Sequence, residues 1–448
     1  MSSTSPVSAK RFGFEYLGPL AVGLLCVRLA MPPVGSPLSG DALLDTSDNT
    51  SFLLQEDPGP ELNSVQLQKQ YVPVVRNNKT VAHKTAYFGQ LRIGSPNPQL
   101  FTVVFDTGSG HLILPSVTCV SEACTKHRRF NRSTSTTAKD IAWNGTVINE
   151  RAEREQLNIT FGTGSVQGEF AEDTVCIGED RPFCAKVRVV LATGMSTDPF
   201  ALFAFDGVLG LGLTALTLDP HFSFFGQMIQ QRPSMKPQFA VFLARQDGGQ
   251  SLITFGGHEP KRAASPMQWV PVAKEELGYW QVHVKRVLVG DVVVDECEDG
   301  TCRAILDTGT SLLGVPKVAA RNLHRLLARS VPGDQTDVTD ISEIDCRTIP
   351  GQVLHFDLGH TVVSLGVEDY SRPAPVNLTL PGQDLWKLLC RSVLLPIDMP
   401  APIGPKVFIW GEPVLRSYYT VYDFAEKRVG FSKAAEGLSS QDSGGPHG

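Results

Sequence analysis

The sequence predicts a mainly β protein built from two similar lobes. Three observations support this: short runs rich in Val, Ile, Phe and Thr, frequent Gly, Pro, Asn and Asp between them, and an internal repeat. With 448 residues, 42% apolar and 19% charged, the chain can bury sizeable cores. The chain has a net charge of -6, whereas nucleic-acid-binding proteins carry clustered positive charge that neutralises phosphates. We therefore expect no nucleic-acid partner.

The first 30 residues have the pattern of a secretory signal peptide. Lys10 and Arg11 precede an apolar run over residues 17–27, LGPLAVGLLCV, and small residues and prolines follow. This run is too short to span a bilayer, so we expect cleavage near Ala30 and no stable membrane span afterwards. A signal anchor is the alternative. No other stretch is long and apolar enough to cross a membrane.

The remaining chain divides by composition into a prosegment, two lobes and a tail. Residues 31–84 are expected to be a partly disordered prosegment, because the part up to about Gln70 is rich in Pro, Ser and Asp. Runs such as TAYFGQLRI, FTVVF and KVRVVLA predict strands in an N-terminal lobe over 85–264. The C-terminal lobe is expected over 265–434, with a helix at Lys317–Arg329, and a flexible tail over 435–448.

The internal repeat is the most informative feature. The chain reads VVFDTGSGHLILP around Asp106 and AILDTGTSLLGVP around Asp307. Aligned on the aspartates, both segments have three preceding apolar residues, Thr and Gly directly after, a hydroxyl residue three on, Leu six on and Pro nine on. Two similar lobes that each present one such loop explain the match.

Two carboxylates at such loops can do acid–base chemistry. An apolar strand that runs into Asp-Thr-Gly places a carboxylate at a strand end, on a turn that glycine allows. If the loops meet, the carboxylates cannot both ionise easily and share a proton. The ionised member can then activate a water, while the protonated member polarises a carbonyl and protonates the leaving amine.

Cysteine usage favours export into an oxidising compartment. Cys26 lies in the signal segment, and three of the four sequential pairs among the other eight cysteines are close in sequence. No C-x-x-C or H-E-x-x-H occurs, so we expect no metal. GLGLTA at 210–215 lacks the βαβ context of dinucleotide binding, so we expect no cofactor. Six glycosylation sequons fit a secretory route, at Asn49, Asn78, Asn131, Asn144, Asn158 and Asn377.

From about Thr85 to Ser432 the chain resembles the pepsin-like aspartic proteases. ITFGTGSVQGEFAEDTV resembles the family's flap hairpin, and FDGVLGLG resembles the segment that braces the first catalytic loop. YWQVHVKRVLVG is similar to the entry of the second lobe, and FIWGEPVLRSYYTVYDFAEKRVGFS to the last strands. The resemblance implies the bilobal acid-protease fold, with a catalytic cleft between two β lobes, and hydrolysis of peptide bonds at acidic pH.

The resemblance also implies roles for individual residues. Asp106 and Asp307 would hold the nucleophilic water, with the dyad supported by Thr107, Gly108, Ser109, Thr308, Gly309 and Thr310. The flap and substrate contacts would come from Phe161, Gly162, Thr163 and Ile113. The family usually has Tyr before G-T-G and Trp seven residues after the first aspartate, joined by a hydrogen bond. Phe161 and Ile113 replace both, so we expect the ring of Phe161 to close by packing against Ile113.

Four disulfides are implied, each between cysteines that are consecutive in the sequence. The expected pairs are Cys119 with Cys124, Cys176 with Cys184, Cys297 with Cys302, and Cys346 with Cys390. The second is an addition to the family pattern. The prosegment departs from it too, since its first part is acidic where the family's is basic. Its candidate inhibitory cations are Lys69, Arg76, Lys79 and Lys84, so self-inhibition through a lysine is in question.

The alternative function is a pepsin-fold protein that binds peptides or proteins without cleaving them. Such relatives typically lose an aspartate or its neighbouring glycine, and this chain retains both loops whole. The expected partners are therefore peptide or protein substrates, with the prosegment as a possible inhibitor. We expect a monomer in the secretory pathway, either secreted or in an acidic endolysosomal or vacuolar compartment.

Overall fold

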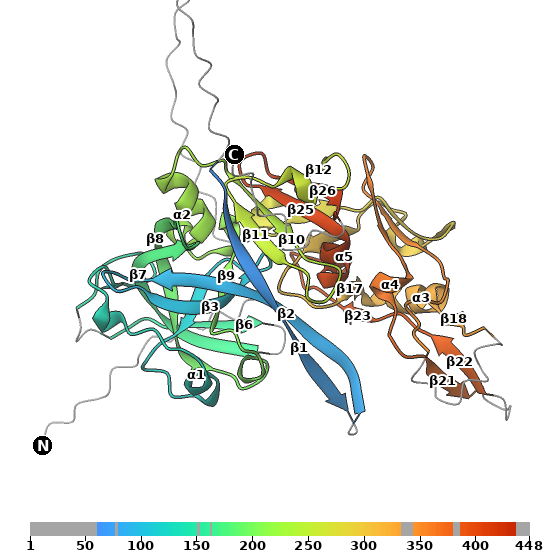
Figure 1. Cartoon of the computed structure of the whole chain (residues 1–448), viewed down its shortest axis with the longest axis horizontal. Coiled ribbons are helices and arrows are strands. Elements are labelled where there is room, and N and C mark those ends of the chain that lie inside the picture. Colours follow the sequence, from blue (N-terminus) through green and yellow to red (C-terminus); the bar gives the residue numbers. More distant parts are fainter. Residues whose placement is uncertain are drawn as a thin grey trace, which may run out of the picture.

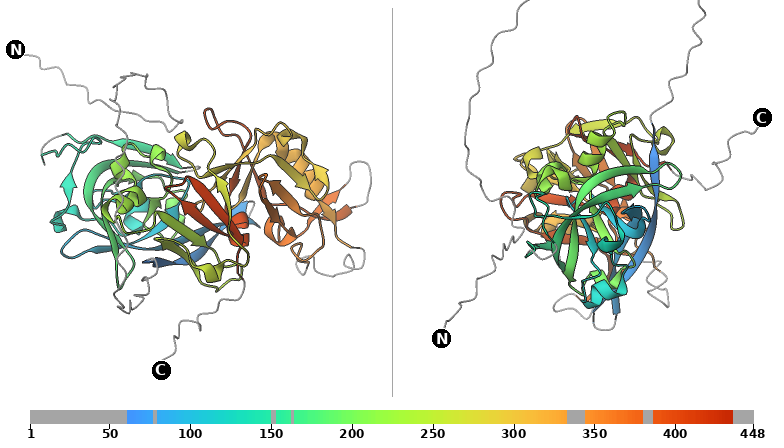
Figure 2. Two further views of the ribbon diagram at one scale, coloured as in Figure 1. Left: turned by 90° about the horizontal axis from the view of Figure 1, so that it is seen from above. Right: turned by 90° about the vertical axis from the view of Figure 1, so that its left-hand side faces the viewer.

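The computed structural model describes residues 61–76, 79–149, 153–161, 164–332, 344–379 and 386–435. The signal peptide expected over residues 1–30 lies outside the described residues, as do the first part of the prosegment and nearly all of the tail expected over 435–448. In Figure 1 the N-terminal half lies on the left and the C-terminal half on the right, with the hairpin of β1 and β2 projecting between them. Figure 2 shows the same two halves side by side from above.

The largest sheet in the described part of the chain has 14 strands and joins the two halves. Its order is β12-β26-β25-β10-β11-β1-β2-β3-β9-β4-β8-β7-β5, with β6 paired to β7. The strands are β1 (Asn63–Arg76), β2 (Lys79–Ile93), β3 (Gln99–Asp106), β4 (Leu112–Pro115), β5 (Lys139–Asp140), β6 (Leu157–Phe161), β7 (Gly164–Ile177), β8 (Phe183–Met195), β9 (Gly207–Gly210), β10 (Gln238–Phe242), β11 (Ser251–Phe255), β12 (Gln268–Pro271), β25 (Tyr418–Asp423) and β26 (Arg428–Lys433).

Three smaller sheets build the rest of the C-terminal half. The first contains β13 (Gln281–His283), β16 (Arg303–Leu306), β24 (Val407–Trp410), β17 (Leu313–Pro316) and β23 (Leu394–Ile397). The second contains β15 (Val292–Val293), β14 (Arg286–Val289), β19 (Leu354–Asp357) and β20 (Val362–Leu365). The third contains β18 (Arg329–Ser330), β22 (Trp386–Cys390) and β21 (Val376–Thr379).

Five short α-helices are present in the described residues: α1 (Glu122–Lys126), α2 (Phe224–Gln231), α3 (Lys317–Leu327), α4 (Val367–Tyr370) and α5 (Glu412–Ser417). The helix expected over Lys317–Arg329 is α3, which buries Ala319 and Leu323 at helical spacing. It ends at Leu327 because Arg329 enters β18 and pairs with Cys390. None of the described helices is long and apolar enough to cross a membrane.

The sequence repeat corresponds to a repeated arrangement of strands. In the N-terminal half, β9 pairs parallel with β3 and antiparallel with β4. In the C-terminal half, β24 pairs parallel with β16 and antiparallel with β17. Each Asp-Thr-Gly loop therefore connects two strands, and a third strand pairs with both of them. The two-lobed, mainly β fold predicted from the sequence is confirmed.

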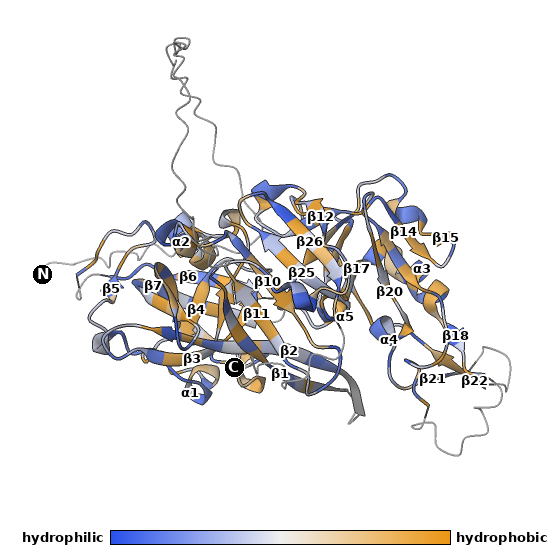
Figure 3. Cartoon of the chain, turned by 45° about the horizontal axis from the view of Figure 1, so that its top comes forward, coloured by the Kyte–Doolittle hydropathy of each residue, from blue (hydrophilic) through white to orange (hydrophobic). Residues whose placement is uncertain are grey.

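Backbone pairing and apolar packing hold the two halves together. Strand β10 of the first half pairs antiparallel with β25 of the second, from Gln238 with Asp423 to Val241 with Thr420. On these strands the rings of Phe239 and Tyr422 stack at 4.6 Å. In Figure 3 apolar residues concentrate on the strands and polar residues on the connecting loops. The core is thus continuous from one lobe to the other.

The cysteines form the four expected pairs, Cys119–Cys124, Cys176–Cys184, Cys297–Cys302 and Cys346–Cys390. Each bond joins neighbours within one half of the chain. The second closes the β7–β8 hairpin, where its two cysteines are direct cross-strand partners. These four bonds therefore fix local loops and do not link the two lobes.

Candidate active site

The two Asp-Thr-Gly loops meet between the lobes. Asp106 is the last residue of β3, and Asp307 directly follows β16. A β-carbon added at Gly108 would lie 2.8 Å from the carboxyl carbon of Asp307, and one added at Gly309 would lie 2.7 Å from Oδ1 of Asp106. Each carboxyl group therefore rests on the glycine of the opposite loop, where a larger side chain would displace it.

Thr107 and Thr308 bond the two loops reciprocally. The hydroxyl of Thr308 accepts the N–H of Thr107 at 2.9 Å, and the hydroxyl of Thr107 accepts the N–H of Thr308 at 3.0 Å. The same hydroxyls donate across the interface, Thr107 to the carbonyl of Leu306 and Thr308 to that of Phe105. These four bonds join residues 199 to 203 positions apart, so they fix the loops of the two lobes against each other.

The two carboxylates receive different sets of donors. The N–H of Gly108 donates to Oδ1 of Asp106 at 2.9 Å, and the N–H of Gly309 donates to Oδ1 of Asp307 at 2.8 Å. Asp307 has a further donor, the hydroxyl of Thr310, at 2.6 Å from Oδ2. These hydrogen bonds are charge-assisted if Asp307 is ionised, which favours that form.

Ser109 occupies the place in the first loop that Thr310 occupies in the second. Its buried hydroxyl has no hydrogen-bond partner of good geometry within the described residues. Burial of Asp106 raises the pKa of that carboxyl, and the nearby hydroxyl of Ser109 opposes the rise without cancelling it. The contact expected between Ser109 and the first carboxylate is therefore weaker than its counterpart between Thr310 and Asp307.

The surroundings of Asp106 favour its protonated form. Burial raises the pKa of Asp106 above its ordinary value, and the neighbouring charge of Asp307 raises it further. The N–H of Gly108 acts in the opposite direction but does not offset burial. Only 9% of Asp106 is exposed, whereas Asp307 is half-buried. The asymmetry suits one protonated and one ionised carboxyl.

The β6–β7 hairpin contains the predicted flap residues. Phe161 is the last residue of β6, and its half-buried ring meets that of Phe200 edge to face at 6.0 Å. Ile113 is buried in the cluster against which Phe161 packs, although a direct contact between them stays a prediction. Gly162 and Thr163 lie outside the described residues. The sequence analysis did not identify Phe200, because a ring so distant in the chain gives no local signal.

Two residues near the loops were missed by the sequence analysis. His111, in the first loop, is buried, and its Nε2 accepts the N–H of Leu218 at 3.1 Å. Glu412, at the start of α5, donates its N–H to the carbonyl of Thr310 at 2.9 Å. A histidine beside the repeat and a glutamate in the G-E-P segment were visible in the sequence, but neither signal indicated burial.

Two basic residues considered as dyad partners form ion pairs elsewhere. Lys69 pairs with Glu412 at 3.0 Å and with Asp247 at 3.2 Å. Lys84 pairs with Asp198 at 3.5 Å. The side chains of the other two candidates, at positions 76 and 79, lie outside the described residues. The ion pairs of Lys69 and Lys84 therefore do not support inhibition of the two aspartates by either lysine.

A large groove lies beside the second loop without containing either aspartate. Its volume is about 1620 Å³, and its wall includes Thr85, Ser311 and Leu312. Ser311 immediately follows Thr310, and its hydroxyl accepts the N–H of Thr85 at 2.8 Å and donates to its carbonyl at 2.7 Å. The groove thus begins at the second Asp-Thr-Gly loop, while the two aspartates lie outside its wall.

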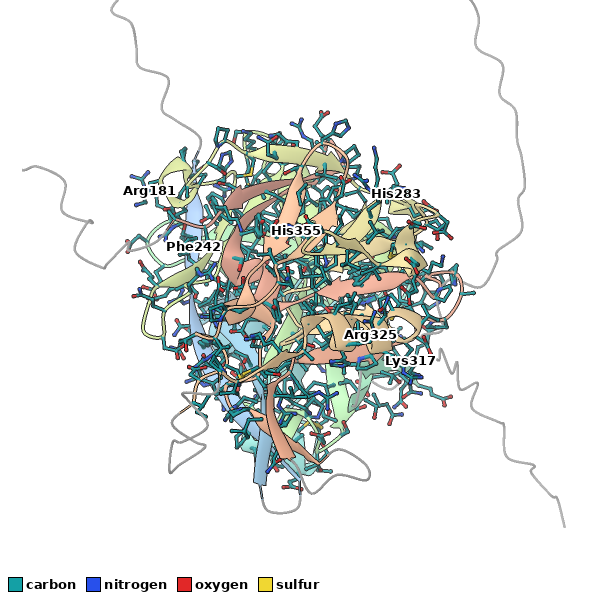
Figure 4. All side chains as sticks on the ribbon, turned by 90° about the vertical axis from the view of Figure 1, so that its right-hand side faces the viewer. Arg181, Phe242, His283, Lys317, Arg325 and His355 are labelled. Carbon is teal, nitrogen blue, oxygen red and sulfur yellow. A yellow bond between two sulfur atoms is a disulfide. The ribbon has the colours of Figure 1, made fainter. Side chains whose placement is uncertain are left out.

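No cluster of three or more His, Cys, Asp or Glu side chains in the described residues could hold a metal ion. Figure 4 shows His283 and His355 well apart. His355 forms a hydrogen bond with the hydroxyl of Ser364 at 2.8 Å. Carboxyl, hydroxyl and backbone groups are thus the polar groups that this site brings together.

Several known proteins are similar to most of this chain. A family model described as eukaryotic aspartyl protease matches residues 86–434. The chain is 34% identical to gastricsin of Homo sapiens over 351 residues, which is 78% of this chain and 82% of the relative. It is 33% identical to cathepsin E of Mus musculus, with 78% and 80% covered, and 32% identical to cathepsin D of Clupea harengus, with 78% and 81% covered.

Proposed function

Because the chain belongs to the eukaryotic aspartyl protease family and is an aspartic-type endopeptidase, we propose that Asp106 and Asp307 are its catalytic dyad. The observation that supports this assignment is that each carboxyl group packs against the glycine of the opposite loop. Such a pair can hold one shared proton and one water between the lobes.

The donor asymmetry supports different roles for the two carboxyl groups. Asp307, with the hydroxyl of Thr310 and the N–H of Gly309 as donors, is the base that takes a proton from water. The water oxygen forms a bond to the scissile carbonyl carbon while Asp106 gives its proton to the carbonyl oxygen. As the C–N bond breaks, the leaving nitrogen receives the proton that Asp307 holds, and the carbonyl oxygen returns its own to Asp106. No covalent enzyme intermediate is needed.

The supporting residues have separate tasks in this proposal. Thr107 and Thr308 keep the loops in register, and the glycines at 108 and 309 leave room for the opposite carboxyls. Phe161, Gly162 and Thr163 cover and bind the substrate as the flap, and Ile113 of β4 provides the apolar surface for the ring of Phe161. The groove that begins at Ser311 receives part of an extended peptide. Activity falls as pH rises through the raised pKa of Asp106, because the acid then loses its proton.

The decisive test is removal of either carboxylate at nearly constant volume. Asp106→Asn and Asp307→Asn should each lower kcat for a synthetic peptide by at least about a thousandfold, while near-ultraviolet circular dichroism stays unchanged. Asp198→Asn is the matched control, since that side chain is exposed and pairs with Lys84. Wild-type kcat in either dyad variant would refute the assignment.

The cellular setting is also a proposal. Four disulfides favour an oxidising compartment, and the signal pattern favours entry into the secretory pathway. We place the protein outside the cell or in an acidic endolysosomal or vacuolar compartment, as a monomer acting on peptide substrates. The expected lobe boundary near residue 264 falls between β11, the last strand of the first half, and β12.

A further inference from the structure

Strand β1 lies inside the segment that composition assigns to the prosegment, yet it is an interior strand. Residues from Asn63 to Leu67 pair with β11, and residues from Gln68 to Arg76 pair with β2. Val65 is 6% exposed and Leu67 is 7% exposed, so both belong to the core. Loss of this strand would open the sheet between β11 and β2 and expose apolar surface.

The side chain of Lys69 ties β1 to the C-terminal half. It is only 16% exposed, and its Nζ lies 3.0 Å from Oε1 of Glu412 and 3.2 Å from Oδ1 of Asp247. The phenol of Tyr87 donates to the same Oε1 of Glu412 at 2.9 Å. Arg416 is a second cation near Glu412, at 3.6 Å. A carboxylate this buried depends on the charge that Lys69 provides.

Glu412 connects this ion pair to the dyad. It is the first residue of α5, and its N–H donates to the carbonyl of Thr310 at 2.9 Å. The hydroxyl of Thr310 in turn donates to Oδ2 of Asp307 at 2.6 Å. In the first loop, the equivalent carbonyl belongs to Ser109 and accepts the N–H of Gly212. Glycine has no side chain, so this hydrogen bond does not connect the first loop to an ion pair. Through this carbonyl the second loop, unlike the first, is linked to a charged side chain.

From this arrangement we infer that Lys69 is a positioning residue for the second catalytic loop and that β1 stays in the active enzyme. Maturation then leaves residues 63–76 in place, and the amine of Lys69 is committed to Glu412 and Asp247 instead of inhibiting the dyad. The inference rests on the proposed role of Asp307. It differs from the expectation that the prosegment extends to residue 84.

The first experiment follows the strand through maturation. The enzyme is activated by acid, captured on an immobilised statine-type inhibitor, and analysed by Edman sequencing and intact mass under denaturing conditions. We expect residues 63–76 in the captured enzyme, either continuous with the lobes or as a retained peptide. Captured, active enzyme that lacks these residues would overturn the inference.

The second experiment tests positioning. Lys69→Met removes the charge but retains much of the side-chain volume, and should lower kcat roughly fivefold with little change in KM. It should also move the acid limb of the kcat profile to higher pH, since a carboxylate with a poorly held donor protonates more readily. Lys69→Arg should restore most of kcat, because it retains the cation.

Lys84→Met is the matched control, because it removes a more exposed lysine of the adjacent strand that pairs with Asp198. Its kcat and pH profile should stay within about twofold of the wild type. A Lys69→Met enzyme with a wild-type kcat and pH profile would overturn the positioning role. Because the Asp307→Asn variant tests the dyad independently, an inactive Asp307→Asn enzyme combined with that result would leave the proposed function intact.

Discussion

The hydroxyls of Ser109 and Thr310 occupy equivalent places in the two loops but have different partners. Thr310 donates to its own loop's carboxylate at 2.6 Å, whereas the hydroxyl of Ser109 has no partner of good geometry among the described residues. A near-symmetric pair of loops thus presents carboxyls in different environments. In the proposed dyad, such a difference would separate the roles of acid and base without any change in residue type.

His111 adds a pH-dependent contribution to stability. Burial lowers the pKa of its ring to about 4, and the ring must stay neutral to accept the N–H of Leu218. The ordinary pKa in an unfolded chain is about 6.5. The stabilisation is therefore fully present above that value, decreases below it, and is lost as pH falls through 4. The loss amounts to roughly 3 kcal/mol.

We predict that His111→Gln will flatten this dependence, because the amide can accept the same hydrogen bond but does not titrate. The urea-unfolding free energy, measured at pH 6.5 and pH 4 in an Asp307→Asn background to prevent self-cleavage, should fall less in the variant than in its parent, by about 2 kcal/mol. His283→Gln, an exposed change, is the control. Equal pH dependence with and without His111 would contradict the prediction.

At the scale of the element, the β6–β7 hairpin depends on apolar contact. Phe161 meets Phe200 edge to face, and Ile113 stands where an indole partner would be needed for a tyrosine. Phe161→Tyr should therefore change kcat/KM less than about threefold, whereas Phe161→Ala should lower it about tenfold or more.

Both variants are measured on one peptide, with Leu202→Ala as the control because that leucine is exposed near Phe200. Wild-type kinetics for Phe161→Ala would show that this hairpin does not cover the substrate. A large gain in kcat/KM for Phe161→Tyr would instead indicate that a hydrogen-bond partner lies within reach of the new hydroxyl.

The strand elements differ in how far the sequence predicts them. The strands leading to the aspartates were predictable, because apolar runs ending in Asp-Thr-Gly recur with matching flanks. Strand β1 was not, because the apolar alternation of Val65 and Leu67 is brief and is surrounded by polar residues. Its partners in β11 are about 190 residues away, and composition averaged over a window contains no information on such pairing.

The same limit applies to the site. The repeat points to Asp106 and Asp307 as the proposed dyad because each Asp-Thr-Gly motif is local in the sequence. Glu412 lies within a segment whose resemblance is visible in the sequence, but its pairing with Lys69 joins opposite ends of the chain and requires the three-dimensional structure. Residues such as Lys69 and Glu412, which we propose act through another group, have no recognisable sequence motif. Their burial in the structure is what distinguishes them from ordinary surface charges.

At the scale of the whole molecule, the lobes share one sheet and should not be independent folding units. Residues 61–264 expressed alone would leave β10 without β25 and Phe239 without its stacked partner Tyr422. We predict that this half is insoluble alone and becomes soluble when produced together with residues 265–448. Analytical size exclusion and thermal unfolding check the outcome. A soluble half that unfolds cooperatively on its own would contradict it.

The cross-lobe hydrogen bonds of Thr107 and Thr308 also determine when during synthesis the two loops can come together. The partners of these bonds are about 200 residues apart, so the first loop leaves the ribosome some 10 to 40 seconds before the second, at roughly 5–20 residues per second. The anchor at Glu412 emerges later still. The nascent chain therefore has no assembled dyad while most of its length is being translated. Proteolytic competence therefore arises only in the last third of synthesis, after both loops have been made.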